Sequence, residues 1–257
     1  MSFDPAWVAP EGLLAGRVVV VTGASEGIGR AVARGLAAHG ATVVAFARTV
    51  ARLESLYDEI VGAGGPEPVI QAVDLEGLGQ NDARTLASAL DEAFGRVDGL
   101  LHNASQLGPR VPLAGYDPAA WKRVMQVNLD AGLLLTQAFL PLLEAGTDPL
   151  VLFTSSGVGR EPRAYWGAYA VSKAATEALV TIFADELEQV SPVRFASLDP
   201  GGTRTAMRAA AYPGEDPETL PTPEDLVPLY LWLFGASRDA AIHGARVDAR
   251  EWLGIAR

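Results

Sequence analysis

Residues 18–30 read VVVVTGASEGIGR, a run of four valines that leads into a turn with three glycines. Consecutive β-branched residues are typical of a buried strand, and Gly23 permits a tight turn directly after it. The missing side chains at Gly27 and Gly29 allow the backbone to approach a pyrophosphate, whose charge is stabilised by the free amides at a helix start. Because a helical pattern follows the turn, the segment predicts a dinucleotide-binding site.

The rest of the chain alternates apolar runs of strand length with longer segments of helical periodicity. This alternation is typical of a doubly wound α/β sheet. We therefore predict a Rossmann-like fold, a mainly parallel sheet of about seven strands with helices on both faces. The strands expected, all read as buried, are Arg17–Thr22, Thr42–Ala47, Pro68–Ala72, Gly99–His102, Leu150–Thr154 and Val193–Leu198. The helices expected are Ile28–His39, Val50–Gly62, Gln80–Phe94, Pro118–Leu143 and Trp166–Val190.

The 257 residues, 49% of them hydrophobic, are predicted to form one domain over residues 1–257. Residues 1–15 are expected to be an N-terminal extension. Residues 206–225 are expected to form a loop after the sixth strand, and its second part, Tyr212–Asp225, contains four prolines. Because ligands bind beyond the carboxyl ends of strands, we expect this loop to cover a substrate; a plain surface loop is the alternative.

The composition disfavours several classes of function. A net charge of −11 repels nucleic acids and anionic membrane surfaces. The absence of cysteine excludes disulfides, thiolate metal sites and a cysteine nucleophile, so redox chemistry needs a bound cofactor. His39, His102 and His243 are scattered, and we expect no metal site. The sequence has neither a signal-peptide pattern nor a membrane-spanning run, which predicts a cytoplasmic protein.

Tyr169 and Lys173 stand four residues apart in a predicted helix, so their side chains lie on one face. A carbonyl reductase needs a proton donor at the substrate oxygen, and a free tyrosine, with a pKa of about 10, is a poor one at neutral pH. A nearby ammonium group lowers that pKa. The alternative is an ordinary pair of exposed helix residues.

The glycine spacing, with three residues and then one between Gly23, Gly27 and Gly29, resembles that of the short-chain dehydrogenase/reductase family. The resemblance covers about residues 16–248 and implies a catalytic role for Tyr169 as acid/base and for Lys173 as its ribose-binding partner. It also implies Ser156 as the donor to the substrate oxygen, with Ser155 as the competing candidate. Asn128 is matched to an asparagine that binds a relay water; a core asparagine bonded to backbone is the alternative.

The same resemblance implies where a cofactor is held. Asp74 matches an acidic residue that contacts adenine, and residues 102–105, HNAS, match the family's Asn-Asn-Ala-Gly motif. Residues 200–205, PGGTRT, match the motif that holds the nicotinamide carboxamide through Thr203 and the Thr205 hydroxyl. The cofactor-binding residues expected are Gly23, Ser25, Glu26, Gly27, Ile28, Gly29, Arg48, Asp74, Leu75, Asn103, Ala104, Tyr169, Lys173, Pro200, Gly201, Thr203 and Thr205.

The end of the second predicted strand favours NADP(H) over NAD(H). Ala47 occupies the position where an NAD site carries a carboxylate for the ribose hydroxyls, and Arg48 beside it can bind a 2′-phosphate. Glu26 argues against NADP(H), because many NADP-using relatives carry a basic residue in the glycine turn. Arg48 as a surface residue at a helix start is the alternative.

Within the family, the sequence most resembles the YciK-like oxidoreductases. The resemblance rests on SSGVGR at 155–160, the run Trp166–Lys173, GGTRTAMR at 201–208 and LYLWL at 229–233. Ser105 departs from the motif glycine, and Ala249-Arg250 stands where relatives often have glycines after Asp248. The second departure concerns the subunit contact rather than the chemistry.

The sequence thus predicts an NADP(H)-dependent oxidoreductase that transfers hydride between the nicotinamide and a small-molecule carbonyl or alcohol. One alternative is a non-catalytic NADP(H)-binding regulatory or scaffolding protein, against which the intact Ser156, Tyr169 and Lys173 argue. Epimerase chemistry on nucleotide sugars is a weaker one. By resemblance, the helices Pro118–Leu143 and Trp166–Val190 pack against another subunit in a homodimer or homotetramer; burial against the sheet is the alternative.

Overall fold

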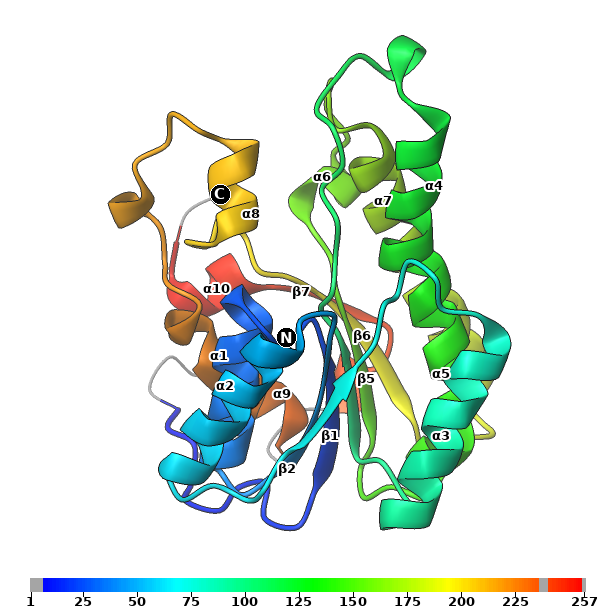
Figure 1. Ribbon diagram of the computed structural model, residues 1–257, viewed down its shortest axis with the longest axis vertical. Helices are drawn as coiled ribbons and strands as arrows, with labels where there is room; N and C mark the ends of the chain where they lie inside the picture. Colours follow the sequence, from blue (N-terminus) through cyan, green and yellow to red (C-terminus); the bar gives the residue numbers. More distant parts are fainter. Residues whose placement is uncertain (1–6, 236–239, 256–257) are drawn as a thin grey trace.

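The computed structural model describes residues 7–235 and 240–255, and these form a seven-stranded sheet with helices on both faces (Figure 1). The strand order is β3-β2-β1-β4-β5-β6-β7, and every neighbouring pair is parallel. The strands are β1 (Val18–Thr22), β2 (Thr42–Ala47), β3 (Val69–Ala72), β4 (Gly99–His102), β5 (Leu150–Thr154), β6 (Arg194–Asp199) and β7 (Ala245–Asp248). The predicted fold class is confirmed, and the sheet is parallel throughout.

The strand order reverses direction between β1 and β4, which lie side by side although two strands separate them in sequence. In an open parallel sheet, such a reversal leaves a crevice outside the carboxyl ends of the two strands. Thr22 ends β1 and His102 ends β4, so the glycine turn and the segment after β4 face each other across that crevice.

Two helical layers bury separate apolar clusters against the sheet. Val19 and Val21 of β1 pack into one cluster, whereas Val18 and Val20 pack into the other, so the run of valines is buried on both faces. The first layer contains α1 (Gly27–Ala38), α2 (Val50–Gly62), α9 (Val227–Phe234) and α10 (Ala249–Leu253). The second contains α3 (Gln80–Phe94), α4 (Pro118–Met125), α5 (Ala131–Glu144) and α7 (Gly167–Leu187).

Three differences from the predicted elements stand out, and the other predicted boundaries that differ are shifted by one to three residues. The run at Pro68–Ala72 was expected to be a buried strand, but β3 is an edge strand and Val69, Gln71 and Ala72 are exposed. The single helix expected over Pro118–Leu143 is interrupted by a π-helical turn, η2 (Gln126–Asp130), which separates α4 from α5. The strand β6 runs one residue further than expected, to Asp199, which brings a carboxylate to the carboxyl edge of the sheet.

The segments predicted as an extension and a loop are both structured where the structure describes them. Residues 7–15 pack onto the domain, because Leu14 is fully buried and the rings of Trp7 and Trp252 lie 6.2 Å apart. Residues 1–6 of the predicted extension lie outside the described residues. The predicted loop 206–225 begins with α8 (Ala206–Ala211) and contains the 3-10 turns η3 (Pro217–Thr219) and η4 (Glu224–Leu226). The last residue of η4 lies one position beyond the predicted end of the loop.

The remaining elements are short: α6 (Gly157–Arg160), η1 (Leu113–Gly115) and η5 (Ala240–Ile242). In Figure 1, α6 and α8 lie beyond the carboxyl edge of the sheet, on opposite sides of the space above β1 and β4. Among the described helices, none has the length and apolar character required to cross a membrane.

Candidate active site

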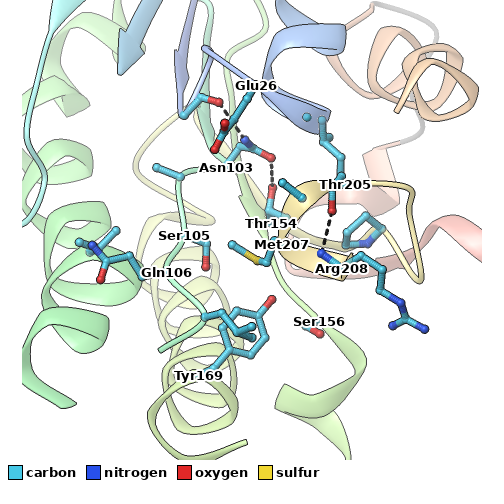
Figure 2. A pocket seen from close by; sticks show the side chains of 18 of the residues that line it. Glu26, Asn103, Ser105, Gln106, Thr154, Ser156, Tyr169, Thr205, Met207 and Arg208 are labelled. Atoms are coloured by element: carbon cyan, nitrogen blue, oxygen red, sulfur yellow. Dashed lines mark hydrogen bonds between the residues drawn. The ribbon is translucent and has the colours of Figure 1, made fainter. Parts of the chain in front are cut away.

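A cleft of about 280 Å³ lies at the carboxyl edge of the sheet. Its wall comes from the segments that follow the strands β1 to β6, together with the first turns of α7 and with α8. Figure 2 shows the cleft with Glu26 and Asn103 at one end and Tyr169 and Ser156 at the other. Every predicted site residue lines it except Gly29 and Asn128, which lie behind the wall.

The glycine turn owes its sequence partly to packing within the protein. Gly23 has a φ of +68°, and a Cβ there would lie 2.8 Å from the Cα of Ala104. A Cβ on Gly29 would lie 2.3 Å from the carbonyl oxygen of Gly23 and 2.6 Å from Nδ2 of Asn103. Gly29 thus allows α1 to pack against the turn, and the expected approach of its backbone to a pyrophosphate stays a prediction. Gly27, which lines the cleft with a φ of +54°, is the glycine that a phosphate can approach.

Thr22, which the sequence analysis did not single out, joins the two sides of the crevice. Its Oγ1 accepts hydrogen bonds from the backbone N–H groups of Asn103 (3.0 Å) and Ala104 (3.1 Å). The same hydroxyl donates to the carbonyl of Leu101 at 3.2 Å. The segment that follows β4 is thereby fixed beside the glycine turn. The threonine directly before the first glycine is the sequence feature that could have indicated this contact.

The charges at the end of β2 suit an anionic group. Arg48 is exposed and lines the cleft directly after Ala47, the last residue of β2. Glu26, at the start of α1, forms an ion pair with Arg52 of α2. The carboxylate that argued against a 2′-phosphate is therefore already neutralised, and two arginines stand at this end of the cleft. Arg52 was not identified from the sequence, because only the fold brings it to Glu26.

The segment after β6 is held by its own hydrogen bonds. The Thr203 hydroxyl donates to the carbonyl of Pro200 at 3.2 Å, and the N–H of Gly201 donates to Asp199 Oδ1 at 2.9 Å. The Thr205 hydroxyl, which was expected to face a nicotinamide, accepts from the N–H of Arg208 at 3.1 Å and so caps α8 (Figure 2). Pro200, Gly201, Thr203 and Thr205 all line the cleft.

Tyr169 and Ser156 meet at the other end of the cleft. Ser156 ends the loop after β5, and its hydroxyl lies close enough to the phenol of Tyr169, on α7, to act on the pKa of that phenol. Tyr169 is 8% exposed, and burial raises its pKa to about 12, although the neighbouring Ser156 hydroxyl acts to lower it. The lowered pKa that the sequence analysis expected from a nearby ammonium is therefore wrong for the protein without cofactor, because burial outweighs it. At neutral pH the phenol therefore carries its proton. Ser155, the competing candidate, also lines the cleft, and its hydroxyl is buried without a hydrogen-bond partner, so the choice of Ser156 stays a prediction.

Lys173 lies one helical turn after Tyr169 and is almost fully buried. Its Nζ is 5.6 Å from the centroid of the Tyr169 ring and donates to the carbonyl of Thr154 at 2.7 Å. Burial lowers the pKa of Lys173 to about 8, and the carboxylates of Asp199 and Glu177 oppose that shift. The ammonium is thus held beside the phenol in its charged form at neutral pH.

Asn128 lies in the π-helical turn and uses its side chain fully within the protein. Its Oδ1 accepts from the N–H of Gln106 at 2.7 Å, and its Nδ2 donates to the Gln106 carbonyl and to Ser172 Oγ, both at 3.0 Å. This is the arrangement expected for a core asparagine bonded to backbone, the alternative given in the sequence analysis. Its amide positions the segment after β4 against α7, and the relay role inferred from the resemblance stays a prediction.

Two ionic networks support the site from behind. Arg250 donates to Asp199 at 2.9 Å and to Asp248 at 2.8 Å, which joins the ends of β6 and β7. Glu177, one turn beyond Lys173, accepts from Arg160 at 3.1 Å and from Arg246 at 3.1 Å. Neither network was found from the sequence, because each joins residues that lie far apart in the chain.

His102 has a structural role. Its Nε2 lies 2.9 Å from the Thr136 hydroxyl, its ring packs on Phe153, and burial lowers its pKa to about 3. Although it ends β4 near the crevice, it does not line the cleft. Among the described residues, no group of histidines and carboxylates is arranged to hold a metal ion.

Comparison with known proteins agrees with this architecture. The sequence model described as short chain dehydrogenase matches residues 17–216. The chain is 46% identical to the uncharacterised oxidoreductase YciK of Escherichia coli over 223 residues, which cover 87% of this chain and 88% of that protein. The chain belongs to the short-chain dehydrogenase family.

Solved structures of other family members extend the likeness to nearly the whole chain. A protein from Pseudomonas syringae assigned to the family matches with a TM-score of 0.92 and 51% identity, over 96% of this chain and 99% of that one. One from a further strain of Escherichia coli, crystallised in complex with NADPH, matches with a TM-score of 0.90 and 45% identity, over 94% and 100%. The resemblance expected from the sequence is confirmed, including that to the YciK-like oxidoreductases.

Proposed function

We propose that this oxidoreductase transfers a hydride between NADPH and the carbonyl carbon of a small molecule. The observation that carries the proposal is the position of Tyr169: it lines the same cleft as Ser156 and the glycine turn, and the Lys173 ammonium lies 5.6 Å from the centroid of its ring. A protein that only binds a nucleotide has no need of a buried proton donor beside a buried ammonium.

NADPH is the cofactor that the residues fit best. Gly27 and the start of α1 form the cradle for its phosphates, and Arg48 is the side chain for its 2′-phosphate, while Arg52 neutralises Glu26 beside it. The family member crystallised with NADPH, 45% identical to this chain, supports the same choice. When bound, NADPH supplies the hydride; Pro200, Gly201 and Thr203 lie where its nicotinamide is held.

Two side chains of the protein bind and protonate the substrate oxygen. The Ser156 hydroxyl donates a hydrogen bond to it, and Tyr169 donates its proton as the carbonyl is reduced. With a pKa of about 12, Tyr169 holds the proton that carbonyl reduction consumes, and the alkoxide that forms as the hydride arrives is basic enough to take it. Alcohol oxidation needs the phenolate, which the Lys173 ammonium stabilises, together with the positive charge of the oxidised ring.

The test removes only the phenolic hydroxyl. Tyr169→Phe is expected to lower kcat for NADPH-dependent aldehyde reduction by about 10²- to 10⁴-fold, because a positioned acid contributes that much. NADPH affinity, measured by fluorescence titration, stays within about threefold. Tyr57→Phe is the matched control, since Tyr57 lies on α2 outside the cleft and its hydroxyl donates to Glu67. Retained turnover in Tyr169→Phe contradicts the proposed role and favours a nucleotide-binding protein without catalysis.

We also propose that α7 forms part of a homo-oligomer interface and that the protein is cytoplasmic. One face of α7 packs into the core through Val180 and Ala184, whereas Val171 and Ile182 are 42% and 53% exposed. Exposed apolar side chains on a helix that also carries the catalytic pair favour contact with a second copy. The mass in solution, from light scattering, tests this part of the proposal.

A further inference from the structure

The substrate end of the cleft is covered by a stack of arginine and aromatic side chains. The guanidinium carbon of Arg110 lies 4.5 Å from the ring centroid of Trp166 and 5.1 Å from that of Tyr212. The guanidinium carbon of Arg208 lies 3.9 Å from the ring centroid of Tyr212, and Arg208 forms an ion pair with Glu215. We call these residues the substrate-side cap: Arg110, Trp166, Arg208, Tyr212 and Glu215.

The cap connects segments on opposite sides of the cleft. Arg110 belongs to the segment after β4, and its guanidinium donates to the carbonyl of Ala211 at the end of α8. Trp166 directly precedes α7, and its ring lies 5.8 Å from that of Tyr212. The cap therefore lies over the end of the cleft where Tyr169 stands, since the Trp166 and Tyr169 rings are also 5.8 Å apart.

The wall beneath the cap is apolar. Leu107, Trp166, Met207 and Ala211 line the cleft at this end, close to Tyr169 (Figure 2 shows Met207 and Tyr169). The other charged residues of the lining, Glu26, Arg48 and Asp74, belong to the end where the cofactor is expected, and Lys173 lies behind Tyr169. Arg208 is thus the cation of the lining that a substrate's own substituents can meet.

Arg208 is not free to act as that cation. Its Nε and Nη2 each donate to a different oxygen of Glu215, both at 2.6 Å. The guanidinium carbon lies over the Tyr212 ring. The pair is partly buried, each side chain being 28% exposed. A two-pronged ion pair of this kind satisfies the edge of arginine that recognises carboxylates. Arg110, the other cation of the cap, does not line the cleft. An anionic substrate would therefore enter an apolar space where Arg208, the cation of the described lining at this end, is already neutralised, and the anion would lose its hydration without a partner.

We propose that the Arg208–Glu215 pair makes this site specific for uncharged aldehydes or ketones with a flat apolar substituent, and that it excludes carboxylated ones. The inference rests on the proposed carbonyl reduction. The reaction takes one hydride from NADPH to the carbonyl carbon and one proton through Tyr169 to the oxygen, giving the alcohol and NADP⁺. The substituent of the carbonyl then lies against Trp166, Leu107 and Met207.

The first test compares substrates of nearly equal shape. Benzaldehyde is compared with 3- and 4-carboxybenzaldehyde, which carry the negative charge at two positions, by following NADPH oxidation. The wild-type protein is expected to use benzaldehyde with a kcat/KM at least about tenfold above either carboxylated aldehyde, because a buried unpaired charge is strongly disfavoured. Equal or better use of a carboxylated aldehyde overturns the inference while leaving the reductase proposal intact.

The second test releases the arginine. Glu215→Gln removes the negative charge that neutralises Arg208. The ratio of kcat/KM for benzaldehyde to kcat/KM for the better-placed carboxylated aldehyde is then expected to fall at least about fivefold, because the carboxylated aldehyde is used better. Adding Arg208→Met to that variant abolishes the gain. Glu218→Gln is the matched control, because Glu218 pairs with Arg204 at 3.0 Å but is 76% exposed and outside the cleft.

The outcomes separate the two proposals. If Glu215→Gln narrows the preference no more than Glu218→Gln, the pair does not set specificity. If the wild-type protein binds NADPH yet oxidises it with none of the aldehydes, carbonyl reduction itself fails, and the specificity inference fails with it.

Discussion

At the cofactor end of the cleft the walls are backbone and glycine, whereas at the substrate end they are large side chains from segments far apart in the sequence. The three glycines lie within the turn after β1. The Thr22 hydroxyl joins this turn to the segment that follows β4, the neighbouring strand in the sheet. The substrate-side cap instead draws on residues 110, 166 and 208–215. The first end is set by local spacing in one segment, and at Gly23 and Gly29 it leaves no room for a Cβ. The second depends on tertiary structure and is open to substitution.

This difference predicts unequal tolerance to mutation. An added methyl group in a backbone-walled turn displaces peptide units, which cannot move independently. A lost contact in a stack of exposed or half-buried side chains removes about 0.5–1 kcal/mol for each cation–π pair. Changes at the cofactor end are therefore expected to have the larger effects.

The largest effect is expected from Gly29→Ala. The new Cβ would lie 2.3 Å from the Gly23 carbonyl oxygen, so α1 and the glycine turn must separate. Overpacking of this kind costs about 1–3 kcal/mol of folding free energy, and we expect NADPH affinity to fall at least about tenfold as the turn shifts. Thermal unfolding and fluorescence titration measure the two effects.

Gly62→Ala is the control for that variant, because Gly62 is also helical and a Cβ there meets nothing within 4 Å. Its stability and NADPH binding are expected to match the wild-type protein. Normal NADPH binding by Gly29→Ala would show that the turn adapts, and the contrast between the two ends would not hold.

An intermediate effect is expected at the rim of the cofactor end, where we propose that a side chain rather than the backbone binds NADPH. Arg48→Ala removes a charge-assisted contact worth about 1.5–3 kcal/mol, which corresponds to a loss of roughly 10- to 100-fold in NADPH affinity. NADH affinity is expected to change little, so the ratio of the two dissociation constants is the measurement. Arg84→Ala, on the exposed face of α3, is the control. An equal loss for NADH would contradict a 2′-phosphate contact at Arg48.

The same contrast explains what the sequence could predict. Strands β2, β4 and β5 have the predicted bounds, because each is an apolar run closed by turn residues. The cleft also contains nearly all the residues expected from the motifs. Those motifs are local, and the parallel sheet brings the ends of successive strands to one edge.

The sequence could not identify contacts between distant segments. The pairing of Glu26 with Arg52 and that of Arg208 with Glu215 follow from how helices and loops are placed, not from any spacing. The exposure of β3 was also missed, because an apolar run does not reveal whether its strand is central or at an edge. The π-helical turn at Asn128 was missed for a related reason: it depends on the bonds from Asn128 to Gln106 and Ser172.

The smallest effect is expected from Arg110→Met, which tests whether the cap acts on the substrate end alone. The change removes the contacts of Arg110 with Trp166 and Tyr212 but leaves the lining of the cleft intact. Two cation–π contacts of about 0.5–1 kcal/mol each, partly replaced by the methionine, correspond to a two- to fivefold rise in KM for benzaldehyde. NADPH affinity is expected to stay constant, as it is in the control Arg163→Met, which alters an exposed arginine of the neighbouring loop. If both KM and NADPH affinity change together, the segment after β4 transmits the disturbance through Asn128 and Thr22, and the two ends of the cleft form one mechanical unit.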